Sequence, residues 1–477
     1  MLRLTSRPKK IIAKEMLFIS KEGLSSYDYS CLVQDNTVMN PFTKESISLY
    51  KETPAFIKVP LYSVLGVVKS AEVFEDHRSK GTAVSFKTTT KLRDGQVPVI
   101  HDFKKGLEKG VSGFIINAPT AWGKTRACIE MSSIAQTTTL VVVHTTSLLK
   151  QWKERLIQHS ELTESDIGTI ANGKADFYGK KVTIGLVHTL GKINIYEQCR
   201  DYFGCIIFDE VDRSVPPETF SSVAEVFCPH IRIGVSATLT RQDEKHIIFQ
   251  KHIGQIKLVG TFTEGHEKVQ QKVIVHKYPR SSGRVYGNNL SATAFKGSLC
   301  TLLANNQERN ALLASYAISG YNTGRKTCII SDRTVQLFYI RQLLVKAGIP
   351  DSDIGYYCDT VMEGSIQRKV SAVEKQHALD DAKIILGTYR MMEAGTDIAT
   401  LALMILGTPL KLVTQTKGRT ERPAEKAQPV LVDIVDTAYD KAVKWFAHRE
   451  QVYVADNMPI KVVQAYSRPN EVLKKVN

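Results

Sequence analysis

The feature that most constrains this chain is an apolar run that leads through a small-residue turn into Gly-Lys-Thr and then a helical pattern. Residues 114–118 read Phe-Ile-Ile-Asn-Ala, residues 123–125 read Gly-Lys-Thr, and residues 126–131 continue as a helix. A strand that enters a helix through such a loop suits phosphate groups, because the loop N–H groups and the helix N-terminus both attract anions. The pattern therefore predicts a phosphate-binding loop.

The residue types in this loop give it specific roles. Lys124 is expected to reach the β- and γ-phosphates, and the Thr125 hydroxyl is expected to hold Mg²⁺. The general pattern opens with a glycine, and here that position is Ala118. Taken alone, Gly-Lys-Thr also fits an ordinary helix start. The predicted nucleotide-binding loop consists of Ala118, Pro119, Thr120, Ala121, Trp122, Gly123, Lys124 and Thr125.

The charge balance points to a polyanionic partner. The 477 residues carry a formal net charge of +15, with 43% hydrophobic and 23% charged residues, which is typical of a folded globular protein. Nucleic acid and an acidic membrane surface both fit this charge, as does a merely basic protein. Because no apolar run approaches the length of a membrane span, we expect no membrane segment and a soluble protein.

The eight cysteines are scattered, and no Cys-x-x-Cys pair occurs. Their spacing predicts neither a structural zinc site nor an iron–sulfur cluster. Several lie within apolar runs, which is typical of core cysteines in a reducing compartment. We therefore expect an intracellular protein.

The order of apolar and polar segments predicts an α/β fold with two parallel-sheet units. Residues 1–90 read as a small, mostly β accessory domain, with strands expected at 55–60 and 64–68. We expect the first α/β domain at residues 91–260, a connector with a β excursion at 261–300, a second α/β domain at 301–436 and a helical tail at 437–477. The expected parallel strands cover residues 139–143, 182–187, 205–208, 231–235, 327–330, 383–386, 403–406 and 429–432.

Two polar motifs follow strands of the first unit. Asp209 and Glu210 come directly after the apolar run 205–208, where a Mg²⁺-binding acid and a base for an attacking water are needed. A solvated acidic turn is the alternative. Ser236, Ala237 and Thr238 follow the apolar run 231–235, a pattern that indicates little when taken alone.

The second unit carries an arginine motif. Residues 415–422 read Gln-Thr-Lys-Gly-Arg-Thr-Glu-Arg, which places Arg419 and Arg422 near one face if the segment is helical. Arginines of this kind stabilise the charge that develops on a γ-phosphate during transfer. A solvated basic helix is the alternative.

In its order, this set of motifs resembles superfamily 2 helicases over about residues 92–435. The resemblance implies two RecA-like domains that bind ATP and Mg²⁺, with motif I at 118–125 and motif II at 209–212. Motif III would lie at 236–238, where Ser236, Ala237 and Thr238 would couple hydrolysis to movement. Motif V would lie at 388–397 and motif VI at 415–422.

The resemblance also assigns individual roles. Gln96 would read adenine, and Gly395 and Asp397 would approach the nucleotide. Gln415 would lie near the attacking water, with Arg419 and Arg422 as arginine fingers. Residues 143–152 look like motif Ia. The residues that would contact a nucleic-acid backbone are Thr145, Gln151, Thr189 and Thr388.

The motif details look most like the branch that includes phage recombination and repair helicases, large-DNA-virus transcript-release helicases and the transcription-repair helicase, with a motor similar to that of type III restriction enzymes. The chain departs from the family pattern at Ala121-Trp122, where a small pair is usual, at Asp212, where many relatives carry His, and at Gly95, where an aromatic is common.

We therefore predict an ATP-dependent helicase or translocase that acts on nucleic acid, with DNA favoured over RNA, alongside replication, repair or transcription partners. One alternative is a translocase on RNA or on a transcription complex without strand separation. Others are a nucleic-acid-binding protein with a vestigial ATPase and the motor of a restriction nuclease.

Overall fold

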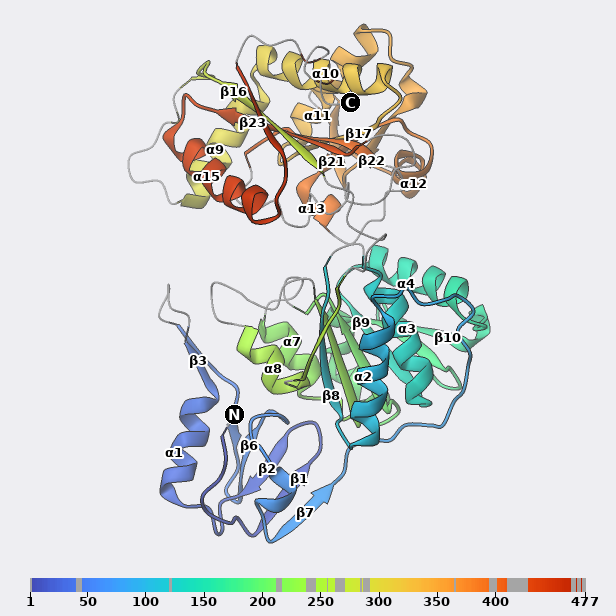
Figure 1. The fold of residues 1–477 in the computed structure, drawn as a ribbon, viewed down its shortest axis with the longest axis vertical. Helices are drawn as coiled ribbons and strands as arrows, with labels where there is room; N and C mark the ends of the chain where they lie inside the picture. The colour runs from blue at the N-terminus through green and yellow to red at the C-terminus, as the bar shows by residue number, and fades with distance from the viewer. Residues whose placement is uncertain are drawn as a thin grey trace. The chain divides into compact units, whose positions relative to one another are not determined.

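The computed structural model of the chain describes residues 2–39, 45–119, 122–211, 217–236, 246–254, 256–261, 271–283, 285, 292–363, 366–393, 401–409, 428–464, 469 and 473. These residues form two compact units, residues 1–266 and residues 267–477, which are drawn in Figure 1. Each unit is built around its own parallel sheet, which confirms the predicted α/β class.

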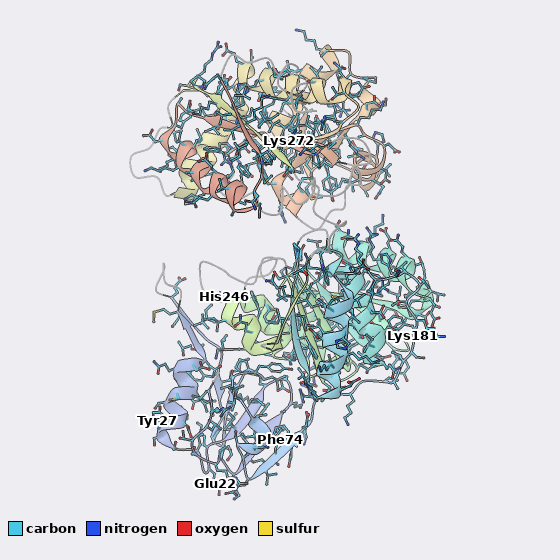
Figure 2. The ribbon with its side chains drawn as sticks, in the orientation of Figure 1. Glu22, Tyr27, Phe74, Lys181, His246 and Lys272 are labelled. Carbon is cyan, nitrogen blue, oxygen red and sulfur yellow. The ribbon has the colours of Figure 1, made fainter. Side chains whose placement is uncertain are left out.

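The first unit begins with a small, mostly β domain. Its sheet has the order β5-β6-β2-β1-β7, and a separate hairpin pairs β3 with β4. Tyr27 is 68% exposed on α1 and is labelled in Figure 2. The elements are β1 (Lys10–Ala13), β2 (Leu17–Ser20), α1 (Ser26–Asp35), β3 (Thr37–Met39), β4 (Ser46–Ser48), β5 (Lys51–Glu52), β6 (Phe56–Val59) and β7 (Val73–Asp76).

The strand expected at residues 64–68 is wrong. Gly66 has a φ of +65° and begins a 3₁₀ turn over Val67–Lys69 instead. A left-handed residue interrupts an extended run, so the apolar residues on either side cannot continue one strand. The strand expected at 55–60 is confirmed as β6.

A buried arginine joins the small domain to the large sheet of the first unit. Arg232 in β14 donates hydrogen bonds to the carbonyl oxygens of Glu15, Phe227 and His252 at 2.8–3.1 Å. Its side chain is 1% exposed, and burial lowers the pKa of its guanidinium to about 10. Three backbone carbonyls from separate segments are thereby fixed around one side chain.

The large sheet of the first unit has the order β11-β10-β12-β9-β13-β14-β8-β15, and only the pair β10–β11 is antiparallel within it. Its strands are β8 (Gly113–Asn117), β9 (Thr139–Val143), β10 (Ile167–Ala171), β11 (Lys174–Asp176), β12 (Val182–Leu186), β13 (Cys205–Asp209), β14 (Ile231–Ser236) and β15 (Ile256–Val259).

Helices cover both faces of this sheet, which is why its strands read as continuous apolar runs. Phe114 and Ile116 pack on one face with α2 and α3, whereas Ile115 packs on the other with α7 and α8. Figure 1 shows the same separation of helices. The helices are α2 (Val97–Glu108), α3 (Lys124–Ala135), α4 (Thr146–His159), α5 (Val187–Leu190), α6 (Ile193–Cys199), α7 (Pro217–Ala224) and α8 (His246–Ile253).

The second unit contains a fully parallel sheet with the order β18-β21-β17-β22-β23-β16-β24. Its strands are β16 (Lys272–Tyr278), β17 (Lys326–Ser331), β18 (Ile354–Tyr357), β21 (Ile384–Thr388), β22 (Leu401–Leu406), β23 (Val430–Asp436) and β24 (Ile460–Val463). The hairpin of β19 (Thr360–Glu363) and β20 (Ile366–Lys369) stands apart from it.

The helices of the second unit pack on both faces of its sheet. Those with described bounds are α9 (Ala292–Ala304), α10 (Gln307–Asn322), α11 (Thr334–Lys346), α12 (Ala372–Asp380), α13 (Tyr389–Glu393) and α15 (Asp440–Ala455). Residues of α10 and α11 share a core cluster on one face, and residues of α13 and α15 share a cluster on the other. Lys272, labelled in Figure 2, opens β16.

Two segments differ from the expected domain plan. The expected connector, residues 261–300, contains β16 and the start of α9, and β16 lies inside the second sheet between β23 and β24. The expected helical tail, residues 437–477, adds β24 to the same sheet beside β16. β16 has seven residues and β24 has four, and both pair with segments that are far away in the sequence, so no local pattern specifies their partners.

None of the helices that the structure describes is both long and apolar enough to cross a bilayer.

Candidate functional site

The carboxyl ends of three neighbouring strands bring the predicted motifs of the first unit together. β13, β14 and β8 are parallel neighbours, and they end at Asp209, Ser236 and Asn117. Because parallel strands all end at one edge of the sheet, the residues that follow them meet there. The backbone N–H of Ala118 donates to the Ser236 carbonyl oxygen at 3.1 Å, so motif III touches the first residue of the loop.

The loop turns into α3 through Gly123. This residue has a φ of +92°, and a Cβ added to it would lie 2.5 Å from Gln96 Nε2, so both its backbone and its surroundings require glycine. Lys124 opens α3, and its Nζ donates to the carbonyl oxygens of Ala118 and Pro119 at 3.0 Å each. The lysine is thus folded back over the loop that it is predicted to serve.

Gln96 is hydrogen-bonded to the backbone of the predicted phosphate loop. Its side chain is 1% exposed, and Nε2 donates to the carbonyl oxygens of Trp122 and Gly123 at 3.0 and 3.1 Å. Its Oε1 accepts from the Arg93 N–H at 2.9 Å. Gln96 is predicted to read adenine, but in this structure its side-chain amide is hydrogen-bonded to the backbone of the loop. These bonds link the Leu-Arg-Asp-Gly-Gln segment to the predicted phosphate loop.

Trp122 fills the space beside the loop. Its indole is 1% exposed and donates from Nε1 to the Thr261 carbonyl oxygen at 3.0 Å. A Cβ on Gly260 would lie 2.5 Å from this indole, and a Cβ on Gly95 would lie 2.2 Å from the Thr261 oxygen. The tryptophan that departs from the family pattern is therefore accommodated by two glycines.

Two carboxylates lie at the end of β13. Asp209 is raised in pKa to about 6, first by burial and then by the charge of Glu210, against the lowering effects of the Trp152 indole, Lys124 and His144. Glu210 has a φ of +51°, a left-handed conformation that strains a non-glycine residue and is often found at functional sites. His144 Nε2 lies 3.8 Å from Glu210 Oε2, and burial lowers the pKa of that imidazole.

One contact at this site has no counterpart in the predicted roles. The indole Nε1 of Trp152, in α4, donates to Asp209 Oδ2 at 2.7 Å. The sequence pattern placed Trp152 at the end of motif Ia but attached no role to it. The Gln-Trp pair was the available signal, yet nothing in it indicates an acceptor on β13.

The candidate nucleic-acid residues occupy different settings. Thr145 caps α4, since its Oγ1 accepts from the Leu148 N–H at 3.2 Å, and Gln151 lies half-buried in the same helix. Thr189 is 6% exposed in the short helix α5. In the second unit, Thr388 is half-buried at the end of β21.

Several predicted residues lie outside the described ranges. They are Thr120 and Ala121 of the phosphate loop, Ala237 and Thr238 of motif III, Asp212 after motif II, Gly395 and Asp397 of motif V, and Gln415, Arg419 and Arg422 of motif VI.

Comparison with known proteins shows what this chain is similar to. Residues 89–241 match the family model described as the res subunit of type III restriction enzymes. A protein of Acanthamoeba polyphaga mimivirus, provisionally named as the ATP-dependent RNA helicase L396, is 26% identical over 416 residues, which are 86% of this chain and 76% of that protein. The DNA 3'-5' translocase XPB2 of Sulfurisphaera tokodaii is 33% identical over 171 residues, 36% of each chain.

The chain is a superfamily 2 helicase. As an ATP-dependent enzyme of this class, the helicase binds nucleic acid. The sheet edge described above carries those residues of the predicted motifs I, II and III that the structure describes. Its fold is also that of S. cerevisiae Dbp5 bound to RNA and ADP BeF3, which aligns with a TM-score of 0.50 at 12% identity over 81% of this chain and 97% of that one.

Proposed function

We propose that the helicase moves along DNA by hydrolysing ATP at the edge formed by β13, β14 and β8. The observation that carries this proposal is the meeting of the Gly123-Lys124-Thr125 loop, Asp209 and Ser236 at one edge of a parallel sheet. Ligands in such sheets bind at the carboxyl ends of the strands. The arrangement supports phosphoryl transfer to water.

The residues present fit a Mg²⁺–nucleotide pair. The Thr125 hydroxyl and the Asp209 carboxylate are oxygen ligands of the kind Mg²⁺ prefers. A half-buried carboxylate with a raised pKa is stabilised in its charged form by a nearby cation. The bound ion would neutralise charge on the phosphates during hydrolysis. Lys124 would exchange its two loop carbonyls for phosphate oxygens, and Glu210 would orient and deprotonate the attacking water.

The second unit is proposed to complete the chemistry through residues outside the described ranges. Gln415 would position the attacking water, and Arg419 and Arg422 would stabilise charge on the γ-phosphate. Gly395 and Asp397 would contact the nucleotide.

DNA is the proposed track, gripped by its phosphates. The net charge of +15 suits a polyanion, and backbone contacts from the start of α4, at Thr145 and Gln151, would hold it without reading bases. The matched restriction-enzyme family and the relative named as a DNA translocase support DNA as the track. Thr189 and Thr388 are proposed as further phosphate contacts.

RNA is the second candidate, because the mimivirus relative that aligns over 86% of this chain is named as an RNA helicase. A helicase of this branch that acts on a transcript or a transcription complex would retain the same ATP site. The two candidates differ in the nucleic acid that stimulates hydrolysis.

The test is steady-state ATP hydrolysis with no nucleic acid, single-stranded DNA, double-stranded DNA or RNA, for the wild-type protein and for Lys124→Ala. We expect DNA to stimulate hydrolysis and Lys124→Ala to reduce the rate at least about 10³-fold, because its ammonium serves the transferred phosphate. Lys174→Ala, an exposed lysine on β11, is the matched control and should behave as wild type.

The outcomes separate the readings. Stimulation by RNA alone would favour the alternative function, movement along RNA or on a transcription complex. No hydrolysis under any condition would contradict the proposed ATPase and favour a vestigial one. Unfolding transitions for all three proteins would show that a lost rate reflects lost chemistry.

A further inference from the structure

The Trp152 indole is held against the motif II aspartate. It is 1% exposed, belongs to the core cluster beneath α4, and donates its N–H to Asp209 Oδ2 at 2.7 Å. The indole has one N–H and no acceptor, so this is the full hydrogen-bonding capacity of the side chain. A short bond to a carboxylate is charge-assisted, and it restricts the side-chain rotation of Asp209.

The same helix carries the proposed nucleic-acid contacts. α4 begins after the Thr145 cap and runs from Thr146 to His159, with Gln151 next to Trp152. Leu148, Trp152 and Leu156 are its buried residues and lie four positions apart along one stripe. A displacement at the start of α4 would therefore reach, through this packed stripe, the indole that bonds to Asp209.

We propose that Trp152 is a positioning residue that keeps Asp209 ready for Mg²⁺ and couples nucleic-acid binding at α4 to nucleotide binding at β13. Trp152 occupies Oδ2 and leaves Oδ1 for the cation. This inference rests on the proposed function, since it takes Asp209 as a magnesium ligand and α4 as a nucleic-acid contact. It adds a residue and a route that the motif pattern does not assign.

An ordinary core tryptophan would stabilise the fold without this linkage. The two cases differ in a binding cycle, because coupling between two ligands is reciprocal and is measured as a ratio of affinities. Trp152→Phe keeps most of the ring and removes the donor. Trp445→Phe, a half-buried tryptophan of α15 in the second unit, is the matched control.

The experiment measures binding of a fluorescent ADP over a series of Mg²⁺ concentrations, with and without a single-stranded oligonucleotide of the type that stimulates the wild-type protein. For Trp152→Phe we expect the Mg²⁺ concentration at half-saturation to rise about tenfold, the size of one hydrogen bond to a charged group. The effect of the oligonucleotide on ADP affinity should fall toward a factor of one. Trp445→Phe should match wild type.

Retention of the wild-type Mg²⁺ dependence and coupling by Trp152→Phe would overturn the inference alone. Absence of Mg²⁺-dependent ADP binding in the wild-type protein would overturn the proposed function and the inference with it. If Trp152→Phe does not fold, the indole ¹H–¹⁵N resonances of the three tryptophans in the wild-type protein give a second readout. The Trp152 resonance should move when Mg²⁺ and ADP are added, and a resonance that stays in place would refute the contact.

Discussion

At the scale of single residues, Trp122 and Gly95 both pack against the Thr261 carbonyl group, so the identity of one constrains the other. The indole of Trp122 donates to the Thr261 carbonyl oxygen, and a Cβ on Gly95 would lie 2.2 Å from that oxygen. An aromatic side chain at position 95 and this buried tryptophan therefore cannot occupy the same structure. The departures from the family pattern at positions 95 and 122 therefore belong to a single packing arrangement beside the predicted phosphate loop.

Gly95→Ala tests this solution. The added methyl group should displace the Thr261 carbonyl and break the indole bond, lowering the free energy of unfolding by about 1–3 kcal/mol. We also expect weaker nucleotide binding, because Gln96 follows immediately and braces the loop. Thermal unfolding and fluorescent-ADP titration measure the two effects.

Gly297→Ala, in α9, is the control. A Cβ added at Gly297 would lie 3.5 Å from Arg333 Nη2, which is an ordinary van der Waals contact. Unchanged stability and affinity in Gly95→Ala would contradict the packing argument.

Asp209 makes the stability of the metal-free protein depend on pH. Its folded pKa of about 6 lies above the ordinary value of 3.8, so the folded state binds more protons between these values and is destabilised as pH rises through them. Asp209→Asn should therefore raise the free energy of unfolding at pH 7.5 by about 1–3 kcal/mol. That advantage should shrink as pH falls from 6 toward 4.

Chemical unfolding in EDTA at pH 7.5 and pH 4.5 measures the difference in free energy of unfolding between Asp209→Asn and the wild-type protein. A difference that is constant with pH would argue against the raised pKa. Asp176→Asn, on β11 of the same unit, is the matched control because its side chain is 60% exposed.

Local patterns predicted the parts of the site that are contiguous in sequence. Gly123-Lys124-Thr125 follows β8, and Asp209 follows β13, where strand-end chemistry was expected. The bonds from Trp152 to Asp209 and from Gln96 to the loop join residues 57 and 26–27 positions apart. Such contacts depend on tertiary packing, which a single sequence does not reveal.

At the scale of elements, β23 is a fully buried strand that carries two aspartates. Asp436 accepts from Arg309 Nε of α10 at 2.7 Å, and Asp433 accepts from Arg449 Nε of α15 at 2.8 Å. All four side chains are at most 1% exposed. A buried ion pair thus joins each of the two helices to β23, so this one strand fixes both helices to the sheet of the second unit.

Arg309→Ala should destabilise the second unit by about 3–5 kcal/mol, because it leaves the Asp436 carboxylate buried without its partner. Arg309 also donates to the Gly407 carbonyl oxygen, which would lose its bond as well. Chemical unfolding of the full chain measures the loss. Arg280→Ala is the control, because its ion pair with Glu308 is exposed and should contribute little. Equal stability of the two variants would contradict this account.

Sequence patterns predicted elements well where apolar runs were long. The runs at 139–143, 205–208, 231–235 and 327–330 are confirmed as strands. A β excursion was expected in the connector, but its place as β16 within the second sheet was not predicted. β24 was missed because it lies in a segment that was predicted to be helical. Their pairing joins positions 273–276 to 460–463, and no local signal specifies such a partner.

At the scale of the whole molecule, the positive charge is the feature that acts at long range. A formal net charge of +15 spread over 477 residues attracts a phosphate backbone whatever its sequence. Affinity that arises from phosphate contacts falls as salt rises, because bound counterions are released.

We therefore expect the dissociation constant for a single-stranded oligonucleotide to increase at least about tenfold between 50 and 200 mM salt. Fluorescence anisotropy measures it, and an uncharged backbone analogue of the same base sequence is the control, which should bind weakly at both salt concentrations. Salt-independent affinity for the natural oligonucleotide would show that stacking or base contacts carry the binding.

The place of β16 in its sheet has a consequence for biosynthesis. A ribosome makes β16 first among the strands of the second unit, but both neighbours of β16, β23 and β24, are among the last to be translated. Until they emerge, this apolar strand has no partner on either side and is open to pairing with another chain. Nascent helicase chains should therefore need a chaperone over this interval, even while the first unit is already folded.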